Sequence, residues 1–401
     1  MSTKSFKLLS FSFLLMALFG ACIKTDSHVE TMACTVDFTT SDSSAKHPKN
    51  AELTKLINDL TALGVPGVSV MLEDENGLWF KSSGYADLKE KTPMSPCHLA
   101  KVASVSKMYS AVLIYQLIGE GKLSLDDLAS KYIDAKHVSK IANLEKATVR
   151  DLLRHSTGIY DVVFDADFIL YTFNNLDKEK TYEKLLSFAY NKPAAFAYNT
   201  KREYNQTLNH VILAMIVEKV TGQSHGDVMK QRIFNPLVLN NTYLRSFMDI
   251  PWPQVAKGYY DVKKNGILQD LTPLYTGDGK GFTGIYTSVN DMRIFTQALF
   301  KQQKLMNGAM YQSMIEIPTL DSTMGITGGC RATKVTVNGK EELWYGHPGG
   351  EVNYAAGAFY SPTKKATLTF IVNYGIAFDD LGKFTNDYYT FRKLLFDAAS
   401  R

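Results

Sequence analysis

The 401-residue chain lacks the features that mark several classes of protein. Its 44 lysines and arginines stand against 40 aspartates and glutamates, and the net charge of +4 is too even to indicate nucleic-acid binding. No H-E-x-x-H motif is present, the eight histidines are scattered, and Gly279-Lys280-Gly281 lacks the Ser or Thr of a phosphate-binding loop. We therefore expect no metal site, no cofactor and no nucleic-acid partner.

Cysteine is also scarce, with four residues and no C-x-x-C spacing. Such a set indicates neither a disulfide framework nor a zinc site. A bond between Cys97 and Cys330 would require an oxidising compartment, and the sequence leaves open whether it forms.

Long apolar runs are confined to the N-terminus. Lys4 and Lys7 precede a mostly apolar stretch at 8–21, which is the layout of a secretory signal and is short for a membrane span of ~20 residues. The stretch ends in small residues directly before Cys22, which resembles a bacterial lipoprotein signal in which Cys22 bears the lipid. An ordinary signal followed by a chance cysteine is the alternative interpretation.

The rest of the chain is typical of a tether followed by one folded unit. Residues 22–50 are rich in Ser, Thr, Asp and Lys, as in a flexible tether, and residues 51–401 contain no second apolar run of ~18 residues. We expect 1–21 to be a signal peptide and 51–401 to be a domain on the periplasmic side of a bacterial membrane, anchored through Cys22. Which membrane holds the anchor and the oligomeric state are left open.

Periodicity predicts strands at both ends of the domain. Asn76-Gly77 and Asn338-Gly339 are each flanked by apolar segments, which predicts two hairpins, and further strands are expected at 355–360 and 366–372. Helical spacing of leucines predicts an amphipathic helix at 51–63. A closing helix is expected to bury one face, formed by Phe384, Tyr388, Phe391, Leu394 and Leu395.

Between these ends, residues 100–300 have mainly helical periodicity. We therefore predict an α/β fold of the α+β type, in which distant parts of the chain close one antiparallel sheet. N- and C-terminal helices flank the sheet, and a large helical insertion covers it. A site is expected in the groove between the layers.

The first candidate for chemistry is Ser104-Val105-Ser106-Lys107, an S-x-x-K motif at the start of an apolar helix. The i, i+3 spacing places Ser104 and Lys107 on one helical face, where an amine can assist a serine nucleophile. Alone the motif is weak, because 43–46 and 361–364 fit it too, and without further context a solvated helix start is the better explanation.

A rival nucleophile lies in Gly222-Gln223-Ser224-His225-Gly226, which fits G-x-S-x-G. That motif requires a strand before the serine, and residues 211–220 have the periodicity and length of a helix. We therefore interpret the segment as a polar link between two helices.

The neighbourhood of Ser104 adds a series of strings in a fixed order: Gly64-Val65-Pro66-Gly67-Val68, Gly84-Tyr85-Ala86-Asp87, Gly119-Glu120-Gly121-Lys122-Leu123, Leu152-Leu153-Arg154-His155-Ser156-Thr157-Gly158 and Asn235-Pro236-Leu237. This order resembles the serine β-lactamase and penicillin-binding protein superfamily, in the branch of class C β-lactamases, D-alanyl-D-alanine carboxypeptidases and esterases. The resemblance runs from about residue 53 to 373. It implies a β-lactamase/transpeptidase-like fold with Ser104 as nucleophile and Lys107 as its partner.

Two further motifs of that superfamily have counterparts. Its Y-x-N resembles Tyr204-Asn205-Gln206, which implies Tyr204 as general base and leaves Gln206 to supply the amide. Gln replaces the usual third residue, and the spacing to the next helix is one residue longer than usual, so the register of this motif is open.

The third motif, H-x-G in some members, resembles His347-Pro348-Gly349. The resemblance implies that His347 supports the proton chemistry or binds an anion, that Gly349 gives the substrate room, and that Gly350 joins Ser104 in an oxyanion hole. Pro348 departs from the pattern, because it offers neither a hydroxyl nor an N–H, which argues against efficient β-lactam turnover.

Together, these motifs predict an exported serine acyl hydrolase that acts through an acyl-enzyme on Ser104. We favour a D,D-carboxypeptidase-like peptidase, with a carboxylesterase second and a β-lactamase third, so the expected substrate is a small peptide, an ester or a β-lactam. A catalytically silent binding lipoprotein is the alternative of another class.

Overall fold

The structure is a computed structural model that describes residues 29–33, 42–317, 325–376 and 384–401. The predicted signal peptide, Cys22 and most of the predicted tether lie outside the described residues. The compact unit considered below begins at Thr31 and runs to Arg401. Within the described part of the chain, no helix has the length and apolar character needed to span a membrane.

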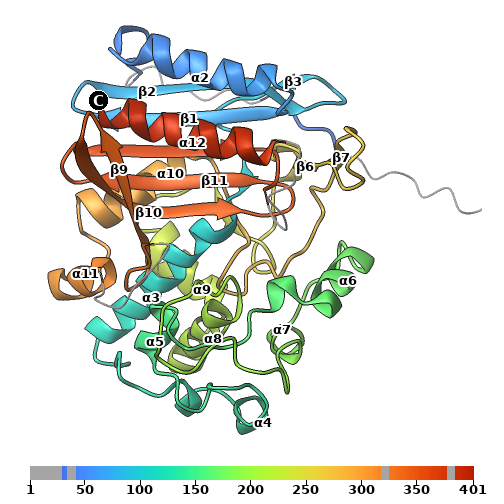
Figure 1. Cartoon of the computed structure of the whole chain (residues 1–401), viewed down its shortest axis with the longest axis vertical. Helices are drawn as coiled ribbons and strands as arrows, with labels where there is room; N and C mark the ends of the chain where they lie inside the picture. The colour runs from blue at the N-terminus through green and yellow to red at the C-terminus, as the bar shows by residue number, and fades with distance from the viewer. Residues whose placement is uncertain (1–28, 34–41, 318–324, 377–383) are drawn as a thin grey trace, which may run out of the picture. The chain divides into compact units, whose positions relative to one another are not determined.

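A seven-stranded antiparallel sheet organises the described unit (Figure 1). Its strands, in spatial order, are β3 (Thr92–Pro93), β2 (Gly77–Asp87), β1 (Gly67–Asp74), β12 (Ala366–Val372), β11 (Ala355–Ser361), β10 (Lys340–Gly350) and β9 (Arg331–Val337). Strand β1 pairs with β12, which joins the two ends of the domain in the middle of the sheet. The predicted antiparallel sheet closed by distant segments is therefore confirmed.

Both predicted hairpins are present. Strands β1 and β2 turn at residues 75–76, one residue earlier than the Asn76-Gly77 pair, because Gly77 already pairs with Asp74 in the sheet, and β9 and β10 turn at Asn338-Gly339. Asn338 and Gly339 have φ values of +51° and +76°, so both turn residues occupy the left-handed region. A tight hairpin of the I′ type needs that conformation at both positions, and Asn-Gly is the pair that adopts it most easily.

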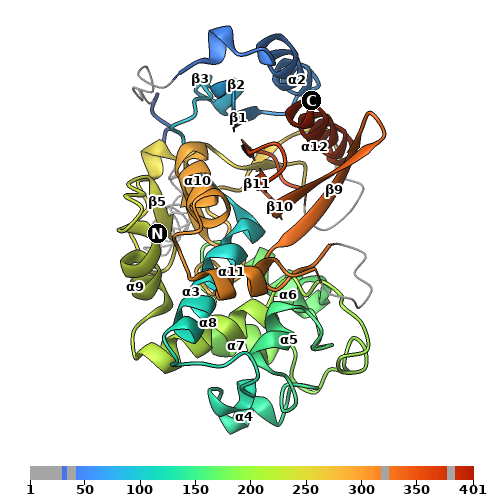
Figure 2. The same cartoon turned by 90° about the vertical axis from the view of Figure 1, so that its left-hand side faces the viewer.

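Helices α2 (Asn50–Ala62) and α12 (Thr385–Ser400) cover one face of the sheet, and α10 (Val289–Thr296) lies on the opposite face with α3 (Ser106–Gly119) beyond it (Figure 2). Side-chain alternation separates the two cores, because Val70 of β1 packs toward α2 and α12 while Met71 packs toward the helical layer.

The helical layer contains the segments predicted between residues 100 and 300. Its α-helices, besides α3 and α10, are α4 (Ala135–Val138), α5 (Val149–Leu153), α6 (Ala166–Asn174), α7 (Tyr182–Ser187), α8 (Leu208–Thr221), α9 (His225–Met229) and α11 (Gly308–Ile315). Short 3₁₀ turns are η1 (Ser44–Lys46), η2 (Ala103–Val105), η3 (Ala129–Lys131), η4 (Val162–Phe164) and η6 (Trp252–Gln254), and π-helical turns are η5 (Lys230–Phe234) and η7 (Gln297–Lys301).

This layer also holds strands that periodicity does not predict. Strand β8 (Ile285–Thr287) pairs with β4 (Ala100–Lys101) and β5 (Thr242–Leu244), and β6 (Tyr259–Tyr260) pairs with β7 (Gln269–Asp270). Each has only two or three residues, which is too few for an alternating pattern.

The link between α8 and α9 agrees with the rejection of a nucleophile elbow. Gly222 ends α8 in the left-handed conformation with a φ of +69°, and the Ser224 side chain caps α9 by accepting from the Asp227 N–H. A helix, not a strand, precedes Ser224.

The two cysteines considered for a disulfide do not pair with each other. Cys97 is disulfide-bonded, whereas Cys330 is a free and buried thiol. Burial raises the pKa of the Cys330 thiol to about 12, so it stays protonated at neutral pH.

Helix α12 differs from the prediction at one position. Phe391 and Leu395 are buried against the sheet, but Leu394, expected on the same face, is 40% exposed. Leu394 directly precedes the buried Leu395 and lies about 100° around the helix from it, so its side chain reaches the solvent.

This arrangement predicts unequal effects on stability from two substitutions on one helix. Phe391→Ala should lower the free energy of unfolding by ~3–5 kcal/mol, because it opens a cavity between α12 and the sheet. Leu394→Ala should cost less than ~1 kcal/mol, since its side chain is largely in solvent. Denaturant titration of both variants would measure the difference, and equal losses would contradict this packing.

Candidate active site

Ser104 lies in the turn η2, between strand β4 and the first turn of α3. Helix α3 begins at Ser106, so the backbone N–H groups around Ser104 face away from the helix and the positive end of its dipole lies nearby. Ala103 has a φ of +48°, a conformation that a non-glycine residue adopts at an energetic cost. The turn is thus held in a strained shape directly before the candidate nucleophile.

Lys107 lies one helical turn further and is only 1% exposed. Its Nζ donates to Ser104 Oγ at 2.8 Å and to the Phe282 carbonyl at 3.3 Å. None of the described carboxylates lies within ion-pairing distance of it. The lysine charge is therefore directed at the serine, where it stabilises loss of the hydroxyl proton.

Strand β10 passes very close to the turn that carries Ser104. A Cβ atom on Gly349 would lie 2.2 Å from the Val102 carbonyl oxygen, so only glycine fits there. This approach brings Gly350 and Ser104 to the same pocket. The two residues implied for the oxyanion hole are therefore neighbours.

Tyr204 lies against two cations. Lys107 Nζ is 5.2 Å from the centre of its ring, and the Arg331 guanidinium is 4.2 Å from that centre. The Tyr204 hydroxyl is buried and has no hydrogen-bond partner among the described residues. Both cations therefore lie over the face of the Tyr204 ring, where its π electrons attract them.

His155 holds the segment on both sides of Tyr204. Its carbonyl accepts from the Glu203 N–H at 3.2 Å, and its Nδ1 accepts from the Asn205 N–H at 3.0 Å. Its ring also lies 4.8 Å from the Tyr204 ring between centres. We call this arrangement the His155 clamp.

The clamp requires a neutral imidazole, since Nδ1 must offer a lone pair. Burial, together with the cations Lys107 and Arg331, lowers the pKa of His155 well below its ordinary value. The residue is therefore neutral at pH 7, with its proton on Nε2. Its φ of +54° shows that the backbone is also constrained. The sequence pattern, in which the histidines are scattered, carries no signal of this contact with Tyr204.

The two side chains that follow Tyr204, those of Asn205 and Gln206, have different surroundings. Asn205 points inward, where its Nδ2 donates to the Ile159 carbonyl and its Oδ1 accepts from the Thr207 and Asn209 N–H groups. Gln206 lines the pocket with Ser104. Of these two amide-bearing residues, Gln206 is the one that lines this pocket, and its role toward a substrate stays a prediction.

His347 lies on β10 with its ring 5.6 Å from the Tyr204 ring between centres. Its Nδ1–H donates to the Pro348 carbonyl, which leaves Nε2 as an acceptor. Burial, with Arg331 and Lys107 nearby, lowers the pKa of His347 well below its ordinary value. A neutral imidazole favours the proton-chemistry role over binding of an anion.

A pocket lies beside Ser104. It is lined by Ser104, Val163, Phe168, Gln206, Thr207, Thr276, Phe282, Thr283, Gly350, Glu351 and Val352. No group of side chains suited to a metal occurs among the described residues.

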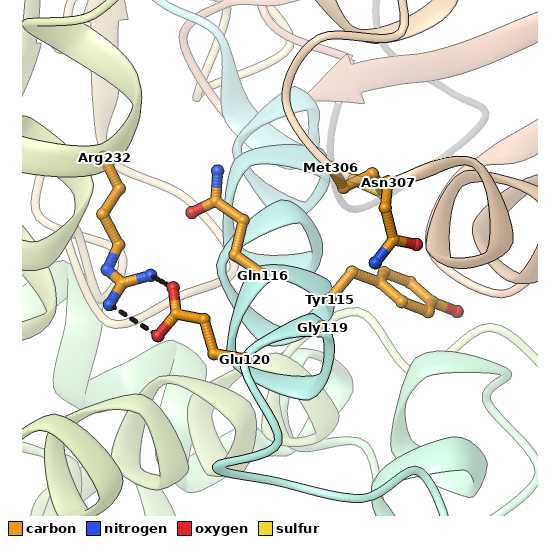
Figure 3. A pocket seen from close by; sticks show the side chains of 7 residues that line it. All are labelled: Tyr115, Gln116, Gly119, Glu120, Arg232, Met306 and Asn307. Carbon is orange, nitrogen blue, oxygen red and sulfur yellow. Dashed lines mark hydrogen bonds and ion pairs between the residues drawn. The ribbon is translucent and has the colours of Figure 1, made fainter.

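A second pocket lies at the other end of α3 and contains none of the predicted site residues (Figure 3). There Glu120 and Arg232 form an ion pair beside Gln116, as the dashed lines in Figure 3 mark. Nothing in this pocket resembles a nucleophile with its base.

Two residues of the site carried no signal in the sequence. Arg331 reaches Tyr204 because β9 pairs with β10 and places Arg331 opposite Gly346. Glu351 follows Gly350 and meets residues more than 65 positions away, such as Thr283. Only the folded chain brings these groups together.

The comparisons with known proteins agree with the family resemblance found in the sequence. The family model described as Beta-lactamase matches residues 53–385. Penicillin-binding protein 4* of Bacillus subtilis (strain 168) is 29% identical over 59% of this chain and 52% of its own length. A putative penicillin-binding protein of the same organism, PbpX, is 27% identical over 68% of this chain and 64% of its own length. The chain therefore spans between half and two thirds of these relatives.

Among solved structures, the D-amino acid amidase from Ochrobactrum anthropi SV3, complexed with L-phenylalanine amide, has a similar fold. Its TM-score is 0.76 at 22% identity, and the match covers 88% of this chain and 98% of that one. At this identity the likeness concerns the fold.

The His155 clamp leads to a prediction for two substitutions at one position. His155→Ala removes the ring acceptor and should lower kcat by ~10–100-fold with little change in KM, because Tyr204 loses its position. His155→Asn should restore part of kcat, since its Oδ1 lies near the former Nδ1 and Asn tolerates the left-handed backbone.

Steady-state kinetics on a p-nitrophenyl ester, with thermal unfolding of each variant, would test this. A loss of kcat that simply follows the loss of stability in both variants would contradict a positioning role.

Proposed function

Because this chain belongs to the Beta-lactamase family, whose members include serine hydrolases, we propose that it is a D,D-carboxypeptidase-like peptidase acting through Ser104. The observation that carries the proposal is the 2.8 Å contact between Lys107 Nζ and Ser104 Oγ in a pocket that Gly350 also lines. At the coarser level, the family match supports a serine acyl hydrolase.

The proposed reaction has two halves. Ser104 Oγ attacks the substrate carbonyl carbon and passes its proton to the Tyr204 phenolate, which Lys107 and Arg331 stabilise. The oxyanion is bound by the N–H groups of Ser104 and Gly350. Collapse breaks the bond to the leaving amine, which takes the proton from Tyr204. In the second half, water attacks the carbonyl carbon of the acyl-enzyme and passes a proton to Tyr204. Collapse then breaks the bond to Ser104 Oγ, which takes the proton back from Tyr204.

Support for a peptidase comes from the predicted export signal and from His347 in an H-x-G motif. A carboxylesterase is the second candidate, because Pro348 on β10 can offer neither a hydroxyl nor an N–H to a substrate carboxylate. A β-lactamase is third. A catalytically silent binding protein is a further alternative, motivated by Gln206 and Pro348, and the intact Ser104, Lys107 and Tyr204 count against it.

Intact mass after incubation with benzylpenicillin tests the nucleophile and separates these candidates. We expect a persistent acyl adduct on the protein that is absent in Ser104→Ala, because the peptidase reading requires acylation with slow release. Hydrolysed drug with unmodified protein would indicate β-lactamase turnover. Protein and drug both unchanged would contradict the peptidase and favour the esterase or the silent protein.

We also propose that the mature protein is anchored on the periplasmic side of a bacterial membrane through a lipid on Cys22. When the chain is expressed with its signal in bacteria, the membrane fraction should contain protein whose N-terminal peptide begins at acylated Cys22. Cys22→Ser should abolish acylation, and Cys330→Ser, at the free thiol, is the control and should not. An N-terminal peptide without lipid would contradict the anchor.

A further inference from the structure

The compact unit begins with a short segment that is docked on the domain. Thr31 is buried, its hydroxyl donates to the Val255 carbonyl at 2.8 Å, and its carbonyl accepts from the Thr92 hydroxyl at 2.9 Å. The Met32 N–H donates to the Pro253 carbonyl at 2.7 Å. The chain is therefore attached to the domain at these two residues.

This attachment limits how far the domain can stand from the proposed lipid on Cys22. The chain from Cys22 to Thr31 spans at most about 30 Å when it is fully extended. A folded unit that runs from Thr31 to Arg401 is expected to have a radius of gyration of about 21 Å, and so a width of about 50 Å. Because the tether is shorter than this width, the side of the domain that holds Thr31 has to face the membrane to which the lipid is attached.

Strand β6 lies beside the docked segment. The Thr31 N–H donates to the Asp87 carboxylate at 3.4 Å, and the next residue after Asp87, Leu88, donates its N–H to the Tyr259 hydroxyl of β6 at 2.9 Å. Strand β6 continues into the loop 261–268, which joins it to β7. This loop is therefore on the side of the domain that holds Thr31.

Helix α6 lies next to the same hairpin. Its Phe173 and the hairpin residue Leu268 pack against one core cluster, and the Tyr275 N–H donates to the Leu176 carbonyl at 2.7 Å. In Figure 1, α6 and the hairpin of β6 and β7 both project from the right-hand side of the described unit. The docked segment, the hairpin loop and α6 thus lie on one side of the domain.

This side of the domain carries large apolar side chains that reach the solvent. Each of the following is between 39% and 65% exposed: Met32, Phe164, Leu170, Leu176, Val262 and Ile267. We call these residues the apolar rim. Val163 of η4 and Phe168 of α6 line the pocket beside Ser104, so the rim adjoins the proposed active site.

We propose that the apolar rim is the face of the domain that contacts the bilayer, and that its side chains insert into the head-group region of the membrane that holds Cys22. A helix and a hairpin loop that expose large apolar side chains gain free energy by burying them at this depth. The Lys184 Nζ, 4.3 Å from the centre of the Tyr171 ring of α6, can stay in water while its stem lies against the ring. The inference goes beyond the proposed hydrolase function and rests on the proposed lipid anchor.

Apolar burial, more than charge, holds the rim on the bilayer. The rim is flanked by exposed residues of both signs, Lys178 and Lys263 against Asp167 and Asp177. Such a mixture gives little net attraction to anionic head groups, so the contact should depend weakly on salt. Because the tether holds this side within about 30 Å of the membrane, the bilayer is the apolar phase that the rim meets.

The test places a tryptophan on the rim of the lipidated protein, reconstituted in vesicles of phosphatidylethanolamine and phosphatidylglycerol. Leu170→Trp and Ile267→Trp should each add emission that lipids brominated in the upper acyl chain quench, because the indole lies at that depth. Leu394→Trp, at an exposed position of α12, is the matched control and should not be quenched. The signal is the difference from the protein with only its own three tryptophans.

Equal quenching at all three positions, or quenching at none, in protein that floats with the vesicles overturns the inference and leaves the anchor and the hydrolase standing. Rim emission that is shifted to the blue but insensitive to brominated lipid indicates a protein partner or a second copy on the rim, and overturns the inference too. Protein that does not float overturns the anchor together with the inference, whereas acylation of Ser104 by benzylpenicillin reports on the hydrolase separately.

A second variant tests whether the helix and the loop act as one face. Ile267→Asp, added to Leu170→Trp, places a carboxylate in the loop and should reduce the quenching at position 170, since a charge resists burial in the bilayer. Leu128→Asp, at an exposed position outside the rim, is the control and should leave the quenching unchanged. Unchanged quenching with Ile267→Asp, or loss of quenching in about 1 M salt, contradicts a rim held by apolar burial.

Discussion

The site depends on how closely strand β10 passes the turn that carries Ser104. At Gly349 the strand approaches the Val102 carbonyl so closely that a Cβ atom would lie 2.2 Å from it. This approach sets Gly350 beside Ser104 and positions His347 and the neighbouring Arg331 over Tyr204. The central pairing of β1 with β12 fixes the sheet, and the sheet in turn fixes β10.

The chemistry around Ser104 follows from burying several basic groups together. Lys107 and Arg331 lie against one tyrosine, and both histidines near it have pKa values held well below the ordinary range by burial and by these cations. Neutral histidines allow the two cations to act on the phenol without added repulsion. An extra positive charge there would raise the electrostatic cost of keeping Lys107 charged beside the serine.

Local patterns account for what could be predicted from the sequence. The Asn338-Gly339 pair fixes a hairpin because few residues adopt its backbone angles, and the i, i+3 spacing of Ser104 and Lys107 is set within one helical turn. The order of motifs then led to Tyr204 and His347. Glu351 and Arg331 reach the site through contacts between segments far apart in the chain, and the strands of two or three residues owe their form to their partners. Such features have no local periodicity to detect.

The His155 clamp has a consequence for how this segment can vary between related proteins. Both of its bonds end on main-chain N–H groups, of residues 203 and 205, so they are indifferent to the side chain at the exposed position 203. Substitution there is tolerated, while a change of length within 203–205 would move Tyr204 out of register. One residue, Thr207, separates Gln206 from α8, which begins at Leu208. A change of length at this point would leave both bonds of the His155 clamp in place.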